Sequence, residues 1–90
     1  MKCVRVLILG RVQGVGFRYF TKRKAKSLGL TGWVKNLDDG GVDALFQGEE
    51  DKISEMVDWC EEGSPLSSVD KVDVRGEPVG EYDDFLIVRE

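Results

Sequence analysis

Apolar residues recur in five short stretches of the chain, and in several of these they alternate with polar residues, as in strands with one buried face. In the first stretch, Val4, Val6 and Ile8 share one face, which is expected to point into the core. Glycine, aspartate and proline residues separate the stretches, as turns require. The predicted strands cover residues 3–9, 30–37, 42–48, 69–75 and 85–89.

Two further stretches repeat apolar residues at intervals of three and four positions, which is the spacing of an amphipathic helix. The first predicted helix covers residues 18–28, and Gly29 can end it. The second begins at the acidic residues 49–51, whose charges suit a helix N-terminus, and stops at Gly63. The apolar stripes consist of Phe17, Thr21, Ala25 and Leu28 in the first helix and Ile53, Met56, Val57 and Cys60 in the second.

The order of these elements is β-α-β-β-α-β followed by a short fifth strand. It predicts an α+β fold, a ferredoxin-like α/β sandwich in which two helices cover one face of an antiparallel sheet. Residues 1–90 are few enough for a single domain with one core. The Asp-Asp-Gly-Gly sequence at residues 38–41 predicts a hairpin between the second and third strands. The core positions expected on the later strands are Val42, Ala44, Phe46, Val72 and Val74.

Histidine is absent from the chain, and this narrows the candidate chemistry. A Ser-His-Asp triad, a Cys-His pair, a histidine-ligated zinc and a phosphohistidine intermediate are all excluded. Cys3 and Cys60 are too few for a four-thiolate metal site, and we predict neither a metal nor a cofactor. Their predicted positions on opposite sides of the sheet argue against a disulfide between them.

No stretch of the chain has the pattern of a signal peptide or a membrane span. The apolar run at residues 3–9 is interrupted by Arg5 and is far shorter than the roughly 20 residues that cross a bilayer. Two cysteines without a disulfide framework favour a reducing compartment. We therefore predict a cytoplasmic protein without membrane contact, and we expect it to be a monomer.

The net charge of −4 hides an uneven distribution. Residues 1–30 contain eight basic side chains and no acidic one, whereas residues 31–90 contain five basic and seventeen acidic side chains. This asymmetry predicts one positive surface that attracts small anions, although a solvated basic helix face accounts for the same charges. Nucleic acid is a poorer partner, because its affinity depends on many phosphate contacts that an acidic protein opposes.

The loop at residues 10–16 contains three glycines and is followed at once by the first predicted helix. Glycines let consecutive backbone N–H groups turn into one concavity, and the positive end of a helix adds to its attraction for anions. Arg18 can close such a cradle, because its guanidinium matches two oxygens of a phosphate. Taken alone, these residues also fit a glycine-rich connection with a surface arginine. The predicted phosphate-binding residues are Val12, Gln13, Gly14, Val15, Gly16, Phe17 and Arg18.

Other motifs for nucleotides and nucleic acids fit poorly. A P-loop requires lysine after its last glycine, where this chain has Phe17, and a dinucleotide fingerprint requires glycine where Tyr19 stands. An RNA-recognition sheet needs several aromatic residues on a central strand. Residues 42–48 contain only Phe46, which is expected in the core. No nucleic acid partner is therefore predicted.

Residues 10–18 resemble the signature Gly-x-Val-Gln-Gly-Val-Gly-Phe-Arg of the acylphosphatase family at every specified position. Residues 32–42, followed by Gly48, are similar to the second signature of that family, and a closing strand with Phe85 and Ile87 also fits. The resemblance covers essentially the whole chain. It implies hydrolysis of the carboxyl–phosphate bond of acyl phosphates to a carboxylate and inorganic phosphate, without a metal or a covalent intermediate.

The resemblance also implies roles for two side chains. The arginine of the first signature, here Arg18, binds the phosphoryl group together with loop amides, and the asparagine of the second, here Asn36, positions the attacking water. Outside such a signature, an asparagine before a turn is typical of local turn chemistry. The implied partners are a small acyl phosphate as substrate and phosphate or sulfate as product or analogue. The alternative is a non-catalytic regulatory module of the same fold that binds anions.

Overall fold

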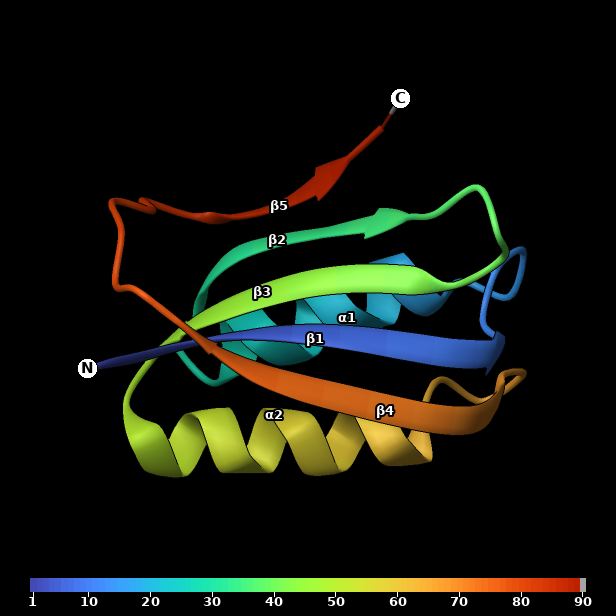
Figure 1. The fold of residues 1–90 in the computed structure, drawn as a ribbon, viewed down its shortest axis with the longest axis horizontal. Helices are drawn as coiled ribbons and strands as arrows, with labels where there is room; N and C mark the ends of the chain where they lie inside the picture. The colour runs from blue at the N-terminus through green and yellow to red at the C-terminus, as the bar shows by residue number, and fades with distance from the viewer. Residues whose placement is uncertain (90) are drawn as a thin grey trace.

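The computed structural model describes residues 1–89, and its elements follow the predicted order (Figure 1). They are β1 (Lys2–Arg11), α1 (Phe17–Ser27), β2 (Thr31–Asn36), β3 (Val42–Gly48), α2 (Glu50–Glu62), β4 (Ser68–Glu77) and β5 (Phe85–Val88). β3 has the predicted bounds, and every other element starts and ends close to its predicted limits. Neither helix of the described chain is long and apolar enough to cross a membrane.

The strands form one sheet in the order β4-β1-β3-β2-β5. β1 pairs antiparallel with β3 and with β4, and β2 pairs antiparallel with β3. The prediction of a wholly antiparallel sheet is wrong at one edge, because β5 runs parallel to β2. β4 and β5 are opposite edges of the sheet, so residues 78–84 carry the chain across its end before β5 enters alongside β2 (Figure 1).

The core lies between the sheet and the two helices, which pack against the same face (Figure 1). The predicted inward positions of β1 and β3 are fully buried or nearly so, and the rings of Phe46 and Phe85 stack with centroids 5.5 Å apart. Full burial of each valine, isoleucine or phenylalanine side chain among them stabilises the fold by about 1.5–3 kcal/mol. The buried core residues include Val4, Val6, Ile8, Val34, Val42, Ala44, Phe46 and Phe85 from the sheet, and Phe17, Ala25, Ile53, Met56 and Cys60 from the helices.

β4 departs from its expected burial. Val72 is partly buried against the core, but Val74 is 46% exposed, although it lies opposite the buried Val6 in the ladder. The prediction that Val74 is a core residue is therefore wrong. The reason is that β4 is an edge strand with a neighbour on one side only, so its side chains lie at the margin of the packed layer.

Both cysteines are buried free thiols. Cys60 belongs to the core between the sheet and the helices, whereas Cys3 lies on β1 at a position that alternates with the core residues Val4 and Val6. The expected separation by the sheet is confirmed. Burial raises the pKa of Cys60 to about 12, and burial together with the nearby Glu77 also raises the pKa of Cys3.

Candidate active site

The loop that links β1 to α1 begins at a β-bulge. The register between β1 and β4 shifts between Leu9 and Gly10. Gly10 has φ +134°, and a Cβ at this position would overlap the backbone carbonyl of Ser68. Only glycine fits here, and the bulge bends the end of β1 toward the loop.

The loop itself is curled by two further glycines. Gly14 and Gly16 have φ values of +73° and +74°, in the left-handed region. None of the backbone hydrogen bonds outside the regular elements of residues 1–89 uses an N–H of residues 13–16, and α1 starts without a side-chain cap. The loop amides and the first-turn amides of α1 are therefore available to an external acceptor such as an anion.

The start of α1 is fixed by packing beneath the loop. Phe17 is 1% exposed, and its ring lies 5.4 Å from that of Trp59 on α2. Arg18, the next residue, is partly exposed and lines the loop surface. The buried Phe17 thus holds the first turn of α1 in place, and the partly exposed Arg18 beside it remains at the surface of the loop.

Gln13 ties the loop to the hairpin between β2 and β3. Its Nε2 donates to the carbonyl of Leu37 at 2.7 Å and to the carbonyl of Gly41 at 2.8 Å. The hairpin is closed by the Leu37 N–H, which donates to the Gly41 carbonyl at 2.8 Å, and the Gly41 N–H donates to Oδ1 of Asp39 at 2.9 Å. The predicted turn is confirmed, and Asn36, which precedes Leu37, is held beside the loop.

Asn36 ends β2 opposite Val42 of β3. Its Oδ1 is buried, and no donor in residues 1–89 forms a hydrogen bond with it. A buried acceptor without a partner costs about 1–3 kcal/mol, so most such atoms in proteins are paired with protein or water. The Asn36 side chain is thus an unused acceptor at a surface that also carries unused donors.

Two clefts meet at this surface. One, which we call the loop cleft, has a volume of about 190 Å³ and is walled by the loop and the first turn of α1. The other, the hairpin cleft, has a volume of about 560 Å³ and extends along Leu37, Asp38 and Val88. The residues that line both clefts are Gln13, Arg18, Asn36 and Arg89.

The structure brings most of the predicted site residues to the loop cleft, which Arg18 and Asn36 both line. Val15 is not among the lining residues; its side chain packs partly against the core, and its carbonyl accepts a hydrogen bond from Ser64 Oγ at 3.4 Å. Val12 is 1% exposed, so mainly its backbone is available at the loop.

Three lining residues, Tyr19, Ile87 and Arg89, were not predicted. The last two reach the loop cleft because β5 runs parallel to β2. The alternating pattern of residues 85–89 gives no indication of which strand they pair with or in which direction.

The charged side chains around the two clefts are Arg18, Arg89 and Asp38. Within residues 1–89, no acidic side chain lies within 4 Å of either arginine. The same part of the chain has no group of three or more Cys, Asp or Glu side chains placed to hold a metal ion. Chemically, the site offers backbone donors, two guanidinium groups, the side-chain amides of Gln13 and Asn36 and, in the hairpin cleft, the carboxylate of Asp38.

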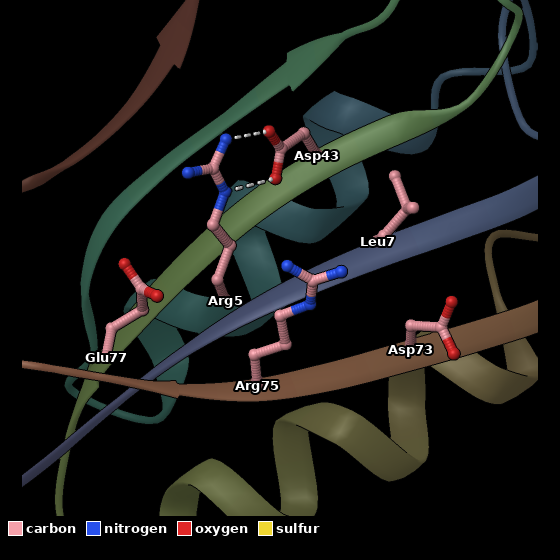
Figure 2. A pocket seen from close by; sticks show the side chains of 6 residues that line it. All are labelled: Arg5, Leu7, Asp43, Asp73, Arg75 and Glu77. Carbon is pink, nitrogen blue, oxygen red and sulfur yellow. Dashed lines mark hydrogen bonds and ion pairs between the residues drawn. The ribbon is translucent and has the colours of Figure 1, made fainter.

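A separate cleft of about 270 Å³ lies over β1, β3 and β4, on the face of the sheet that the helices do not cover (Figure 2). Arg5 donates two hydrogen bonds to Asp43, at 2.6 and 3.1 Å, and these raise the pKa of Arg5. The other charged side chains that line the cleft are Asp73, Arg75 and Glu77. Because charges of both signs are mixed here and Arg5 is already paired, this cleft has no net attraction for anions.

Fold and loop together define a small α+β protein of the ferredoxin-like class, with a glycine-rich loop of backbone N–H groups, unpaired within residues 1–89, between β1 and α1. A family model described as acylphosphatase matches residues 4–87. A relative named acylphosphatase from Acaryochloris marina (strain MBIC 11017) is 48% identical over 97% of this chain and 94% of its own length. The crystal structure of acylphosphatase from Bacillus subtilis is 41% identical, with a TM-score of 0.96 over 99% of this chain and 100% of that one. The chain belongs to the acylphosphatase family and is thus a hydrolase.

A similar unit also occurs inside a larger protein. The crystal structure of full-length HypF in its phosphate- and nucleotide-bound form matches 98% of this chain with a TM-score of 0.88 and 35% identity. The match covers only 12% of the HypF chain. The fold is therefore found both as a small protein and as a part of a much longer one.

Proposed function

We propose that this protein hydrolyses the carboxyl–phosphate bond of acyl phosphates and releases a carboxylate and inorganic phosphate. The observation that carries the proposal is the convergence of Arg18, Asn36 and the unpaired loop amides on one cleft. Family membership supports it, because the matching relatives are named for this activity.

In the proposed mechanism, the phosphoryl group lies in the loop cleft. In a loose phosphoryl-transfer transition state, negative charge is spread over three equatorial oxygens. The loop amides of residues 13–17 and the guanidinium of Arg18 would donate to these oxygens. Such donors are fixed before the reaction begins, and each charge-assisted hydrogen bond contributes roughly 1.5–3 kcal/mol.

Asn36 would hold the attacking water. Its buried Oδ1 can accept a hydrogen bond from a water, and so place that water in line with the phosphorus and the leaving oxygen. The water oxygen bonds to phosphorus, the bond to the acyl oxygen breaks, and its electron pair leaves with the carboxylate. The proton lost by the water ends on the released phosphate. A carboxylate is a good leaving group, so positioning and charge stabilisation suffice without a metal or a protein nucleophile.

The two side chains are distinguished by different kinetic effects. We expect Asn36→Ala to lower kcat for benzoyl phosphate by about 100-fold while inhibition by inorganic phosphate stays within about 2-fold, because the variant loses only the water-holding group. Arg18→Ala should weaken phosphate inhibition as well as turnover. All assays contain excess chelator.

Equal loss of phosphate affinity in both variants would contradict this division of roles, and strict dependence on an added divalent metal would contradict the metal-free reaction. A wild-type protein that binds phosphate but releases none from any acyl phosphate would instead favour the non-catalytic module. The match inside HypF gives that second candidate its support.

We also propose that the protein acts as a cytoplasmic monomer. Two buried thiols without a disulfide fit a reducing compartment. A loop cleft formed within one chain requires no second copy.

A further inference from the structure

Arg89 is a cationic residue at the site that neither signature contains. In the parallel ladder, Gly32 lies opposite Phe85, Val34 opposite Ile87 and Lys35 opposite Val88. Continuing this register by one residue places Arg89 beside Asn36.

The alternation of β5 points to the same side of the sheet. Phe85 is buried in the core on the helix-covered face, Leu86 is 55% exposed, and Ile87 packs against the core again. Two residues further on, Arg89 falls on the face that α1 covers, where Arg18 lies in the first turn of that helix. Arg89 lines both clefts, together with Arg18 and Asn36.

Two guanidinium groups on one small surface repel each other unless an anion or an acidic side chain lies between them. Within residues 1–89, no acidic side chain lies within 4 Å of Arg18 or Arg89, and Asp38 borders only the hairpin cleft. A dianion in the loop cleft would relieve this repulsion, and it would gain more from two fixed charges than a monoanion of the same shape.

We propose that Arg89 is a second phosphoryl-binding residue, which makes the site select doubly charged phosphoryl groups over singly charged ones. This inference rests on the proposed function, because it places the phosphoryl group in the loop cleft. Arg18 and the loop amides donate hydrogen bonds to one side of the phosphoryl group. Arg89 donates to an equatorial oxygen on the side of β5. The preferred substrates are then acyl phosphates whose phosphate is free and doubly charged. Acyl phosphates whose phosphate is esterified, and therefore singly charged, are disfavoured.

The test measures binding of two inert tetrahedral anions at one pH: sulfate, which is a dianion, and methyl sulfate, which is a monoanion. Dissociation constants come from NMR titration of the Gly14 and Gly16 amides, so they do not depend on turnover. For Arg89→Gln we expect the dissociation constant of sulfate to rise about 5-fold and that of methyl sulfate less than about 2-fold, as suits a partly solvated charge. Arg89→Lys should retain most of the sulfate affinity.

Arg11→Gln is the matched control, because it removes the same charge from an exposed residue that lines neither cleft. Its sulfate dissociation constant should stay within about 2-fold of wild type. An Arg89→Gln effect no larger than that of Arg11→Gln, or an equal weakening of sulfate and methyl sulfate, would overturn the inference.

Failure of the proposed function has a different signature. If wild-type protein binds sulfate through Arg89 but hydrolyses no acyl phosphate, the function is wrong and the binding role of Arg89 stands. If benzoyl phosphate is hydrolysed and Arg89→Gln binds sulfate like wild type, the function stands and the inference is wrong. Urea unfolding of Arg89→Gln, expected to match wild type, excludes a folding defect as the cause.

Discussion

Gln13 connects the two parts of the chain that carry the site. Its Nε2 donates to two hairpin carbonyls, those of Leu37 and Gly41, so the loop and Asn36 cannot move independently. From the sequence alone, Gln13 is expected to bind phosphate as one member of the loop. Its side chain has a different role in the structure, because both N–H groups of the amide donate to carbonyls of the hairpin and neither is free to donate into the cleft.

Gln13→Met should therefore lower kcat more than it lowers anion affinity. Met has a similar length and no donor, so the loop keeps its amides but loses its tie to Asn36. We expect kcat for benzoyl phosphate to fall about 10-fold through misplacement of the water, with sulfate affinity within about 3-fold of wild type. Steady-state kinetics and NMR titration measure the two effects.

A suitable control is Gln47, whose side chain also forms two hydrogen bonds, with the N–H and the carbonyl of Gly80, both at 2.9 Å. Neither Gln47 nor Gly80 lines the loop cleft or the hairpin cleft. Gln47→Met should reduce the free energy of unfolding by about 1–3 kcal/mol, as Gln13→Met should also do, and leave kcat unchanged. If both variants keep the wild-type kcat, Gln13 has a structural role only.

Within the elements, the position least tolerant of a side chain is Gly32 of β2. It has φ +134°, and a Cβ there would overlap the carbonyl of Leu45 on the neighbouring strand. Gly32→Ala should lower the free energy of unfolding by roughly 3 kcal/mol, from steric overlap together with the strained φ. Because β2 carries Asn36 at its end, loss of activity should follow loss of structure. Urea unfolding measures the change.

Gly76 of β4 provides the comparison. A Cβ there meets nothing within 4 Å, and its φ lies outside the left-handed region. Gly76→Ala should change the free energy of unfolding by less than about 1 kcal/mol. Similar destabilisation of both variants would mean that Gly32 is not held against Leu45 as described.

Much of the architecture follows from local patterns that the sequence displays directly. The alternation of Val4, Val6 and Ile8 reports one buried face, and the stripe that includes Thr21 and Ala25 reports the inner face of α1, since both depend only on the geometry of their own element. The loop glycines and Arg18 could likewise be placed at the site from their order along the chain.

What could not be predicted depends on partners that are distant in sequence. The parallel pairing of β5, the exposure of Val74 at an edge, and the position of Arg89 in the same cleft as Asn36 all follow from which strands become neighbours. A pattern within one strand is the same whether that strand lies at the centre or the edge of a sheet. The hydrogen bonds of Gln13 to the hairpin could not be predicted either, because Gln13 and the hairpin are also distant in sequence.

Across the whole molecule, folding redistributes the uneven charge of the chain. Half of the basic side chains in residues 1–30 form ion pairs with acidic residues from later in the chain. The pairs are Lys2 with Glu50 at 3.3 Å, Arg5 with Asp43 at 2.6 Å, Lys24 with Glu55 at 3.3 Å and Lys26 with Asp84 at 2.9 Å. The hydrogen bond from Lys26 lowers the pKa of Asp84.

The basic side chains of this segment that lack an acidic partner within 4 Å in residues 1–89 are Arg11, Arg18, Lys22 and Arg23. The predicted positive surface is therefore narrower than the sequence suggests. The four residues lie at the end of β1 and within residues 18–23 of α1, and of the four only Arg18 lines the two clefts beside the loop.

The stability of the whole molecule should depend on pH above neutrality through Cys60. Burial raises the pKa of this thiol from 9.0 to about 12, so the folded state favours the protonated form. A group whose pKa is raised by folding contributes its stability in full below the unfolded pKa and loses it as the pH rises. From about pH 9 toward pH 12, Cys60 should thus reduce the free energy of unfolding by roughly 1 kcal/mol for each pH unit.

Cys60→Ala isolates this contribution, because every other ionisable group is shared with the wild type. The variant should be less stable at pH 7, where it leaves a small cavity in the core, but its free energy of unfolding should fall less steeply above pH 9. The two curves, measured by urea unfolding at each pH, therefore converge as the pH rises. Parallel curves would mean that the thiol ionises as readily in the folded protein as in the unfolded chain, which its burial against the sheet does not allow.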